Sequence, residues 1–391
     1  MTARSILHAI FCLMKAIQLD SLTQIDRDQW NSLASPNYPF LRHEFLSALE
    51  RSRSTSPENG WQPRHLLIYE QNEPVALMPL YLKFHSRGEY VFDYQWAEAY
   101  HNHHLAYYPK WLTAIPFTPC QGPRIAIKTG ADQRRIVSFI ASYIKETIAD
   151  TGASSWHCLF PDLTSAEQLV SEGLSLRTGI QFQWFNKGYR DFNDYLDGFS
   201  AGKRKQVKRE RRRIAEQSVQ FRQISGKDIS VQDWEAFYRF YQMTYFKRGM
   251  QPYLNIGFFL EIAETMPQNL LLIVAVKDGD YIGAALSFIG NDTLYGRYWG
   301  CHEEYHSLHF EACYYQGLDY CLANDLQRFD SGAQGEHKIA RGFEPVYTYS
   351  AHWIKNRRFA AAIDDFLEWE TAEIQKYRLQ AEKHLPFKQQ T

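Results

Sequence analysis

A polar, glycine-rich segment at residues 330–345 carries the residue types best suited to proton transfer and to anion binding. It follows a short strand pattern and contains three glycines, which permit positive φ angles and a close approach of the backbone to a ligand. A Glu or His of near-neutral pKa can accept the proton of an attacking amine. Arg side chains or backbone N–H groups can hold a developing oxyanion. The segment supplies candidate catalytic residues (Glu336, His337 and Arg341) and candidate substrate-binding residues (Gln334 and Lys338). The alternative interpretation is a polar surface loop.

The strand pattern that follows this segment adds two further substrate-binding candidates. Tyr349 and His352 lie on it and are expected to face the same space as the polar segment. His337, His352 and Glu336 do not have the spacing of a known zinc site, so no metal is expected.

A second polar group lies in the first half of the chain, on a strand–turn–strand pattern. Its members are substrate-binding candidates: Lys83, His85, Glu89, Asp93 and Trp96. Alternation along a strand places Lys83 and His85 on one face, and we expect Lys83, with Arg341, to hold an anion. Ion pairing between the two strands explains these residues equally well.

A strongly basic helix is predicted near residues 200–217. Residues 203–213 hold eight basic side chains and one acidic one among good helix formers. Because basic residues fall on nearly every face, deep burial is not expected. Lys203, Arg204 and Arg211 are candidate ligands for phosphates of a cofactor, a lipid-linked substrate or an RNA. A solvated helix at a domain junction is the alternative.

The elements that must position these residues occur twice in the same order. Each half contains a helix, a hairpin, a third aromatic strand, an amphipathic helix and a further strand. The hairpins fall at residues 66–82 and 272–288, the third strands at 90–96 and 293–299, the amphipathic helices at 132–149 and 310–324, and the last strands at 155–160 and 328–330. A repeated unit of this size predicts two α/β (α+β) domains of one fold type.

The repeat also predicts the domain boundaries. Residues 1–15 form an N-terminal extension, 16–180 the first domain and 181–391 the second domain, which includes the basic helix. Residues 97–131 interrupt the first half as a long aromatic and histidine-rich insertion, which is expected to be functional.

Composition and absent motifs exclude several classes of protein. The 391 residues carry a net charge of −1, so overall charge predicts no polyanion partner and no DNA. The six cysteines lack CxxC spacing, which is typical of a reducing compartment and predicts a cytoplasmic protein. No apolar run reaches the length of a transmembrane helix. Walker, GxGxxG, GxSxG and HExxH motifs are missing, which disfavours NTPases, dehydrogenases, serine hydrolases and zincins.

The chain resembles the FemAB-like family of N-acyltransferases, described as peptidoglycan biosynthesis/recognition, within the GNAT superfamily. The resemblance covers residues 16–386 and rests on the motifs at 60–65, 79–83, 85–93, 96–100, 107–110, 116–119, 332–338, 341–345 and 350–353. It implies two GNAT-like folds in tandem, with mixed sheets flanked by helices. Three further residues of these motifs are thereby assigned to substrate binding: Tyr100, Tyr108 and Lys110.

The resemblance also implies a chemistry. Fem-type relatives move an amino acid from aminoacyl-tRNA onto a cell-wall precursor, whereas acetyl-CoA enzymes hold the pyrophosphate with a Q/RxxGxG/A loop. Neither half has that loop, which disfavours acetyl-CoA and leaves aminoacyl-tRNA or another acyl carrier as the donor. The donor, aminoacyl-tRNA or acyl-CoA, is expected as a co-substrate, with no permanently bound cofactor. We expect an N-acyltransferase that acts on the amine of a small or lipid-linked acceptor. The alternatives are a non-catalytic protein that recognises a peptidoglycan precursor and a nucleic-acid-binding module.

Overall fold

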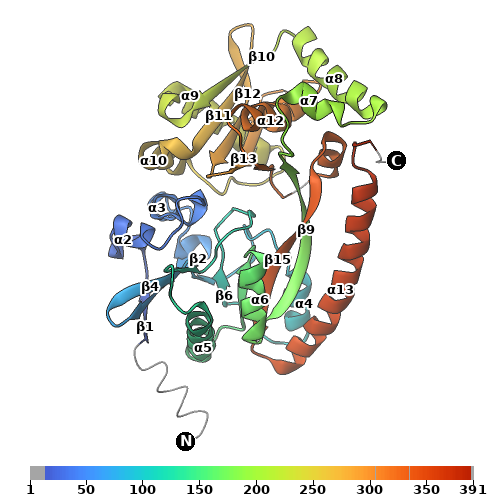
Figure 1. The fold of residues 1–391 in the computed structure, drawn as a ribbon. Helices are drawn as coiled ribbons and strands as arrows, with labels where there is room; N and C mark the ends of the chain where they lie inside the picture. Colours follow the sequence, from blue (N-terminus) through green and yellow to red (C-terminus); the bar gives the residue numbers. More distant parts are fainter. Residues whose placement is uncertain (1–13, 304, 334, 389–391) are drawn as a thin grey trace, which may run out of the picture. The chain divides into compact units, whose positions relative to one another are not determined.

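The chain forms two compact units (Figure 1). The computed structural model describes residues 14–303, 305–333 and 335–388. Unit 1 comprises Met1–Gly179 and Thr348–Ile374, and unit 2 comprises Ile180–Tyr347 and Gln375–Thr391. Residues 348–374, which the sequence analysis placed in the second domain, therefore lie in unit 1.

In the described part of unit 1 the strands form two groups. The first is antiparallel and has the order β1-β3-β4-β7. The second has the order β15-β8-β6-β5-β2 and is mixed, because β6 and β8 run parallel. The strands are β1 (Met14–Leu19), β2 (Trp61–Pro63), β3 (His65–Glu70), β4 (Glu73–Met78), β5 (Tyr81–Lys83), β6 (Lys110–Thr113), β7 (Ala126–Ile127), β8 (Ser155–Leu159) and the second half of β15 (Glu344–Ile354). The helices are α2 (Arg27–Asn31), α3 (His43–Arg51), α4 (Tyr94–Asn102), α5 (Gln133–Thr151), α6 (Leu163–Ser171) and the first part of α13 (Arg357–Lys383).

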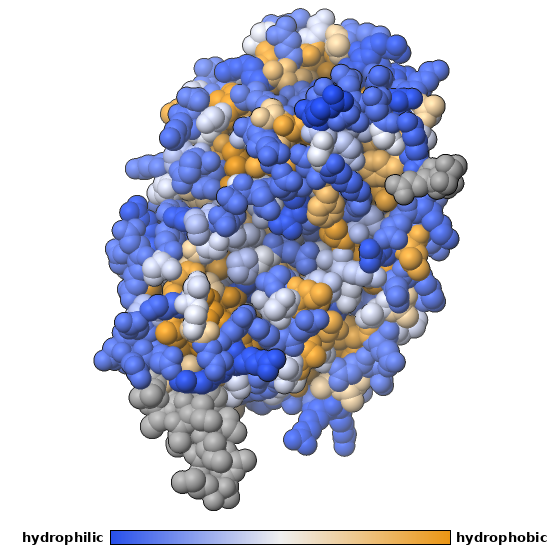
Figure 2. Space-filling model, in the orientation of Figure 1, coloured by the Kyte–Doolittle hydropathy of each residue, from blue (hydrophilic) through white to orange (hydrophobic). Residues whose placement is uncertain are grey.

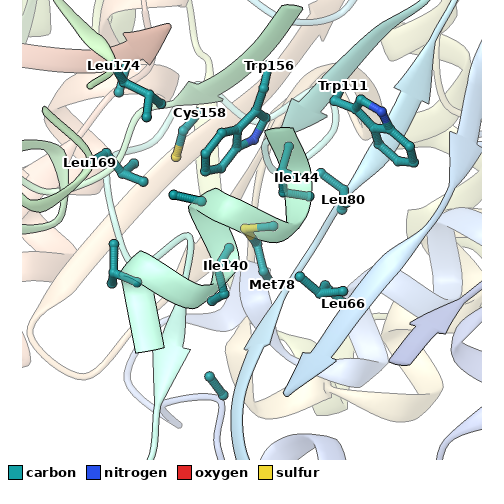
Figure 3. Close-up of a cluster of buried hydrophobic side chains, with 14 of the residues drawn as sticks. Leu66, Met78, Leu80, Trp111, Ile140, Ile144, Trp156, Cys158, Leu169 and Leu174 are labelled. Carbon is teal, nitrogen blue, oxygen red and sulfur yellow. The ribbon is translucent and has the colours of Figure 1, made fainter. Parts of the chain in front are cut away.

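Helix α5 organises the core of unit 1, as its apolar spacing predicts. It begins after Asp132, whose side chain accepts from the backbone N–H of Arg135, and ends at Gly152, whose φ is 69°. Its apolar face packs on both strand groups (Figure 3). The buried residues of this core include Leu66, Met78, Leu80, Trp111, Ile140, Ile144, Trp156 and Cys158.

Two sequence-based expectations for unit 1 are wrong. Residues 90–96 do not form a strand, because Gly88 and Tyr90 have positive φ angles and α4 begins at Tyr94. The strand that follows the β3-β4 hairpin and pairs with β4 is instead β7. Residues 97–131 are not a loop insertion either, since they contain most of α4, all of β6 and all of β7. Met14 and Lys15, assigned to an extension, begin β1, whereas residues 1–13 lie outside the described residues.

Unit 2 is built around one mixed run of strands, in the order β10-β11-β12-β13-β14-β9, among the residues described. Its strands are β9 (Ser175–Phe185, whose second half lies here), β10 (Gln220–Ser225), β11 (Leu270–Lys277), β12 (Asp280–Ile289), β13 (Thr293–Cys301) and β14 (Arg328–Asp330). Its helices are α7 (Phe192–Asp197), α8 (Ala201–Glu216), α9 (Val231–Phe246), α10 (Ile256–Thr265), α11 (Leu308–Phe310), the π-helical turn η6 (Glu311–Tyr315), α12 (Gln316–Ala323), the 3₁₀ segment η7 (Glu336–Arg341) and the end of α13.

The central strands of unit 2 follow from local sequence signals. The predicted Asp278-Gly279 hairpin is confirmed, with both residues at positive φ and β11 paired antiparallel to β12. The pairing of β12 with β13 skips Arg297, which produces a bulge in β13. Strand β14 then runs parallel to β13, so the connection between them must cross over, and it does so through α11, η6 and α12.

Gly342, which follows η7, is expected to be indispensable for the stability of unit 2. Its φ is +82°, and an added Cβ would lie 1.9 Å from the Tyr195 hydroxyl, which donates to the Arg341 carbonyl at 2.6 Å. Gly342→Ala should lower the free energy of unfolding by about 2–4 kcal/mol, because a strained φ and a steric clash add. Gly188→Ala is the matched control, since Gly188 has the same φ with open space around it, and should cost about 1 kcal/mol. Chemical denaturation measures both, and equal losses would contradict the role of the Tyr195 contact.

One face of the molecule is mostly polar. Figure 2 shows hydrophilic residues over much of the face drawn, with hydrophobic residues in scattered groups. Within the described residues, no helix is both long and apolar enough to cross a membrane.

Candidate functional site

A pocket of about 480 Å³ opens in unit 2. Three segments line it: the end of α9, the end of β13 and the stretch that leads into α11. The lining residues are Thr244, Lys247, Arg248, Trp299, Cys301, Tyr305, Ser307, Leu308, His309 and Phe310. Two cations and several aromatic rings thus surround one cavity, a combination that suits a ligand with both anionic and apolar parts.

The approach of α9 to β13 fixes the shape of this pocket. A Cβ at Gly300 would lie 2.0 Å from the Phe240 carbonyl oxygen, so only glycine lets the helix lie so close to the strand. One turn later, the Thr244 hydroxyl donates to the Trp299 carbonyl at 2.9 Å. These contacts hold the last turn of α9, with Lys247 and Arg248, beside the pocket.

His309 is the pocket residue best placed for proton transfer. Its ring packs against Trp299 (centroids 5.8 Å apart), Tyr314 (5.3 Å) and His337 (5.7 Å). Among the described residues, neither ring nitrogen has a hydrogen-bond partner. Burial, followed by the nearby His337, Arg341 and Lys338, lowers the pKa of His309 to about 4. The imidazole is therefore neutral at pH 7 and able to accept a proton.

His337 lies next to His309 and is held by Tyr314. The Tyr314 hydroxyl and His337 Nε2 are 2.7 Å apart. Burial, with Arg341 and Lys338, lowers the pKa of His337 as well. Gly335, at a φ of +114°, makes room for the ring, because a Cβ there would lie 2.3 Å from His337 Cε1. The two neutral imidazoles therefore pack against each other, with His309 on the wall of the pocket.

Arg341 supports this pair from inside the unit. Its guanidinium lies 3.5 Å from the Phe310 ring centroid, donates to the Glu210 carboxylate at 2.8 Å and donates to the His337 carbonyl at 2.6 Å. The residue is 3% exposed. We expected Arg341 to bind an oxyanion or another substrate anion, but the Glu210 carboxylate already occupies its guanidinium. The Arg341 side chain instead fixes the backbone of His337.

The basic helix α8 (Ala201–Glu216) forms where it is predicted, but its faces differ. Val207, Glu210 and Ile214 form its one buried face, and the rest of the helix is exposed or half-buried, so the helix is not deeply buried. The opposite face is exposed and carries four cations at helical spacing (i, i+3, i+4, i+7), which we call the α8 stripe: Lys205, Lys208, Arg209 and Arg212. In the described structure, the first three make no ion pair, and Arg212 makes one exposed contact with Glu216 at 3.4 Å.

The cations predicted as anion ligands on α8 are mostly engaged elsewhere. Arg211 pairs with Glu311 at 3.0 Å and Asp319 at 2.6 Å, and Arg204 pairs with Asp197 at 3.1 Å. Lys203 is half-buried. At the end of the helix, Arg213 Nη1 lies 2.9 Å from His306 Nε2, which ties α8 to the segment that lines the pocket.

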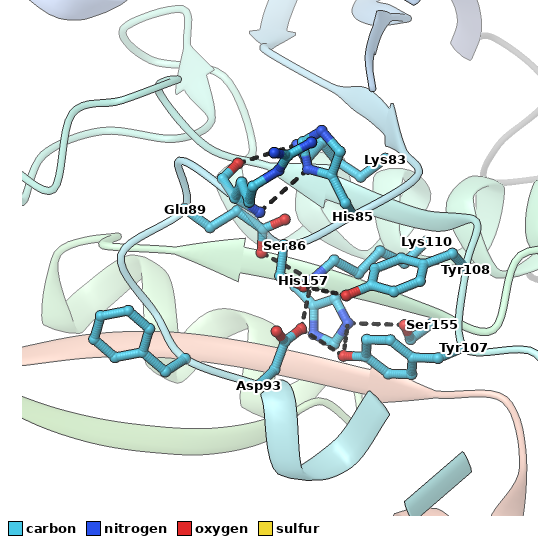
Figure 4. Close-up of polar contacts among 12 residues, drawn as sticks. Lys83, His85, Ser86, Glu89, Asp93, Tyr107, Tyr108, Lys110, Ser155 and His157 are labelled. Carbon is cyan, nitrogen blue, oxygen red and sulfur yellow. Dashed lines mark hydrogen bonds and ion pairs between the residues drawn. The ribbon is translucent and has the colours of Figure 1, made fainter. Parts of the chain in front are cut away.

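A separate cluster of buried charges lies in unit 1 (Figure 4). Lys110 Nζ donates to Ser86 Oγ and Glu89 Oε2 at 2.8 Å each and also to Asp93 Oδ2. Burial raises the pKa of Glu89 to about 7 despite the opposing effect of Lys110. Burial disfavours the charged forms of Lys110 and Asp93. Attraction by Glu89 and Asp93 nevertheless raises the pKa of Lys110, and attraction by Lys110 lowers the pKa of Asp93. The sequence-predicted residues Glu89, Asp93 and Lys110 thus meet in one network.

Lys83 lies near this network but differs from Lys110. Its Nζ sits 3.6 Å from the Trp61 ring centroid and 3.4 Å from His85 Nδ1, and the residue is fully buried. Burial lowers the pKa of Lys83 to about 6. Lys83 is therefore a neutral amine at pH 7 and not the anion ligand that we expected. Burial and Lys83 together lower the pKa of His85, whose Nε2 lies 2.9 Å from the Asn59 carbonyl.

The remaining candidates of unit 1 are aromatic and histidine residues around the same network. His352 Nδ1 lies 2.7 Å from His157 Nδ1, and Trp96 packs edge-on against His352 at 4.9 Å. The Tyr108 hydroxyl is 2.8 Å from Ser86 Oγ, and Tyr100 is a buried ring that contacts Phe359. Tyr349 is half-buried. Tyr349 and His352 belong to unit 1, whereas residues 336–341 belong to unit 2. The space that we expected these residues to share is therefore not found within either unit.

The comparison with known proteins decides the family. The FemAB-like family, described as peptidoglycan biosynthesis/recognition, matches residues 21–389. The chain belongs to this family. No curated protein matches it in sequence.

Two solved structures with TM-scores above 0.5 share the fold of this FemAB-like protein, and a third is similar to it at a lower score. FemX aligns with a TM-score of 0.53 at 11% identity, over 90% of this chain and 100% of FemX. The C-terminal DUF2156 domain of a lysylphosphatidylglycerol synthetase from Agrobacterium fabrum, titled as putative, aligns with a TM-score of 0.53 at 9% identity, over 89% of this chain and 97% of that domain. A tandem GNAT protein from the clavulanic acid biosynthesis pathway aligns with a TM-score of 0.46 at 10% identity, over 88% and 99% of the two chains. The predicted fold class, mixed α/β with sheets flanked by helices, is confirmed.

The remaining candidate residues of the FemAB-like chain belong to unit 2. Glu336 is exposed, and its Oε1 accepts from the Tyr377 hydroxyl at 2.6 Å, so it faces α13 rather than Tyr314. Lys338 is buried and donates to the Gly332 carbonyl. Gln334 lies outside the described residues. In the parts of the chain that are described, no group of His, Cys, Asp and Glu could hold a metal ion.

Sequence reasoning missed His309 and Glu210. His309 stands in a stretch without a motif, and the available signal was its place just after the third strand of the second half, where a helix must begin. Glu210 was visible as the single acid among eight bases. A lone carboxylate in such a run is expected to have a buried partner, and Arg341 is that partner.

Proposed function

We propose that this FemAB-like protein transfers an acyl or aminoacyl group to an amine, with the unit 2 pocket as its reaction site. The observation that carries the proposal is His309, a neutral imidazole without a hydrogen-bond partner among the described residues, on the wall of a 480 Å³ pocket. The family description supports a peptidoglycan precursor as the acceptor. The fold shared with FemX supports direct transfer between two bound substrates.

The proposed reaction is a single displacement at the acyl carbon. The acceptor nitrogen forms a bond to the carbonyl carbon, and the bond from that carbon to the carrier oxygen or sulfur breaks. His309 takes the proton that the nitrogen loses, and the leaving atom of the carrier receives it. His337 and Tyr314 keep the His309 ring in place, while Lys247 and Arg248 bind an anionic part of one substrate.

The α8 stripe favours an RNA as the carrier of the acyl group. Neighbouring cations at positions i, i+3, i+4 and i+7 form one exposed line about 10 Å long, since each helical residue rises about 1.5 Å. Such a line can contact consecutive phosphates of a nucleic-acid strand. Arg213 and His306 connect this helix to the pocket lining, so a bound carrier would have its acyl end within reach.

Neutralising the α8 stripe should weaken RNA binding. For the variant Lys205→Gln/Lys208→Gln/Arg209→Gln, we expect the affinity for deacylated total tRNA to fall on the order of 10–100-fold at low salt. The slope of log K against log salt should decrease by about 2. Filter binding at several salt concentrations measures both quantities.

The control for this experiment carries the same change of charge elsewhere. Arg134, Lys227 and Lys355 are exposed cations that do not belong to α8. Their combined replacement by Gln should leave tRNA affinity within about twofold of the wild type. If the two triple variants lose affinity equally, or if the wild type does not bind tRNA, the RNA-borne donor is wrong. The acyl-CoA donor would then be the one to test.

A further inference from the structure

The end of helix α9 presents an exposed turn with an unusual mixture of side chains. Residues 246–251 (Phe-Lys-Arg-Gly-Met-Gln), which we call the α9 turn, are all exposed. Phe246 is 52% exposed and Met250 is 41% exposed, and both are large apolar side chains. The segment contains two cations and no acid. Single exposed apolar residues are common, but two of them on one short basic turn call for a physical reason.

The α9 turn is held in shape by its own backbone. The Met250 N–H donates to the Tyr245 carbonyl at 3.1 Å, and the Gly249 N–H donates to the Phe246 carbonyl at 2.9 Å. Together with the positive φ of Gly249, this pair of bonds closes the helix as a Schellman cap. The exposure of Phe246 and Met250 is therefore built into an ordered helix end.

The cations of the turn are available for a ligand. Among the described residues, Lys247 Nζ contacts two carbonyl oxygens, those of Cys301 and His302, at 3.5 and 3.4 Å. Within the described residues, Arg248 makes no hydrogen bond or ion pair through its side chain. Since neither cation meets a carboxylate of the described residues, their charge is available to an outside partner.

We infer that the α9 turn docks on the surface of a bilayer that contains anionic phospholipids. Lys247 and Arg248 match the negative headgroups, and Phe246 and Met250 match the boundary between headgroups and acyl chains. An RNA would leave the two apolar side chains in water. A protein partner would need roughly 800 Å² of surface on this side, which six residues do not supply.

The docking site has a consequence for the pocket but does not depend on its chemistry. Lys247 and Arg248 also line the pocket, so docking places the pocket opening at the level of the headgroups. A substrate that is anchored in the membrane could then enter without leaving it. The inference holds whether or not the pocket catalyses acyl transfer, because the assay below uses no donor and no acceptor.

Vesicle co-sedimentation tests the inference. The probe is a set of vesicles made of phosphatidylcholine alone or of phosphatidylcholine with 30% phosphatidylglycerol. The full chain is expected to sediment with the anionic vesicles and not with the neutral ones. Phe246→Ser/Met250→Ser should reduce binding by about 10-fold through lost apolar contact. Lys247→Gln/Arg248→Gln should reduce it by about 30-fold through lost headgroup attraction.

The α8 stripe provides the matched control on the same unit. Lys205→Gln/Lys208→Gln/Arg209→Gln removes three exposed cations, one more than the α9-turn variant, from a surface without large apolar side chains. It should bind vesicles as the wild type does. All substitutions are at exposed positions, and thermal unfolding verifies that each variant remains folded. The inference is overturned if the wild type ignores anionic vesicles, if the α9-turn variants bind them like the wild type, or if the α8 variant loses binding as strongly.

Discussion

His309→Gln is expected to lower the rate of amide formation by about 10²-fold, the lower end of the usual contribution of a positioned general base, because a pKa of about 4 makes His309 a weak base. The amide of Gln is close in size to the imidazole but cannot take up a proton. The donor should bind with nearly unchanged affinity, because Lys247, Arg248 and the α8 stripe remain. Single-turnover kinetics with a preformed donor complex separate the two quantities, so the loss should appear in the rate constant and not in Kd.

The pH profile sharpens this prediction. The pKa of His309 is lowered to about 4, so the wild-type rate should show no loss from protonation of His309 between pH 5 and 8. A decline should begin only near pH 4, and His309→Gln should lack it. His302→Gln is the control, since His302 is exposed and outside the pocket lining. A His309 variant with the wild-type single-turnover rate would remove His309 from the mechanism.

Lys110→Met should destabilise the protein by about 3–5 kcal/mol, the usual cost of removing one partner from a buried ion pair. The substitution leaves Glu89 and Asp93 buried without their cation. The loss should shrink as the pH falls below about 7, because the two carboxyls can then take up protons. Adding Glu89→Gln and Asp93→Asn should restore part of the stability at pH 7.

Lys83→Met is the matched control, because it replaces the other fully buried lysine of the same region. The pKa of Lys83 is lowered to about 6 in the folded chain, whereas the ordinary value is 10.5. The wild-type stability should therefore rise with pH between about 6 and 10.5, and this rise should vanish in the variant. At pH 7 the substitution should be neutral or stabilising. Urea unfolding at several pH values gives these data, and similar losses for both lysine variants would refute the distinction between them.

Local signals predicted the elements of each unit well. The α5 pattern, the Asp278-Gly279 turn and the basic run over α8 each depend on residues that are close in sequence. The strand expected at 90–96 does not form, because the aromatic alternation does not determine the backbone conformation of that segment. Glu89 and Asp93 are drawn to Lys110, about 20 residues farther along the chain, and Gly88 and Tyr90 adopt the positive φ angles that this requires.

The sequence predicted only part of the candidate site, for the same reason. His337 and Arg341 were selected by type, but their roles depend on distant partners. Arg341 became a support for His337 because Glu210, 131 residues away, neutralises it. His309 became the better base because tertiary packing left its nitrogens free within the described structure. Such assignments come from packing, which a single sequence does not reveal.

The central claim is that the unit 2 pocket forms an amide bond, and mass spectrometry of an acceptor tests it most directly. A soluble peptidoglycan precursor with a free amine is incubated with the full chain and, in turn, with mixed aminoacyl-tRNAs and mixed acyl-CoAs. We predict that the precursor gains the mass of one acyl or aminoacyl residue with one donor class, and that His309→Gln abolishes most of the gain. An acceptor that remains unmodified with both donor classes, while the protein binds it, would contradict the account and indicate a recognition protein.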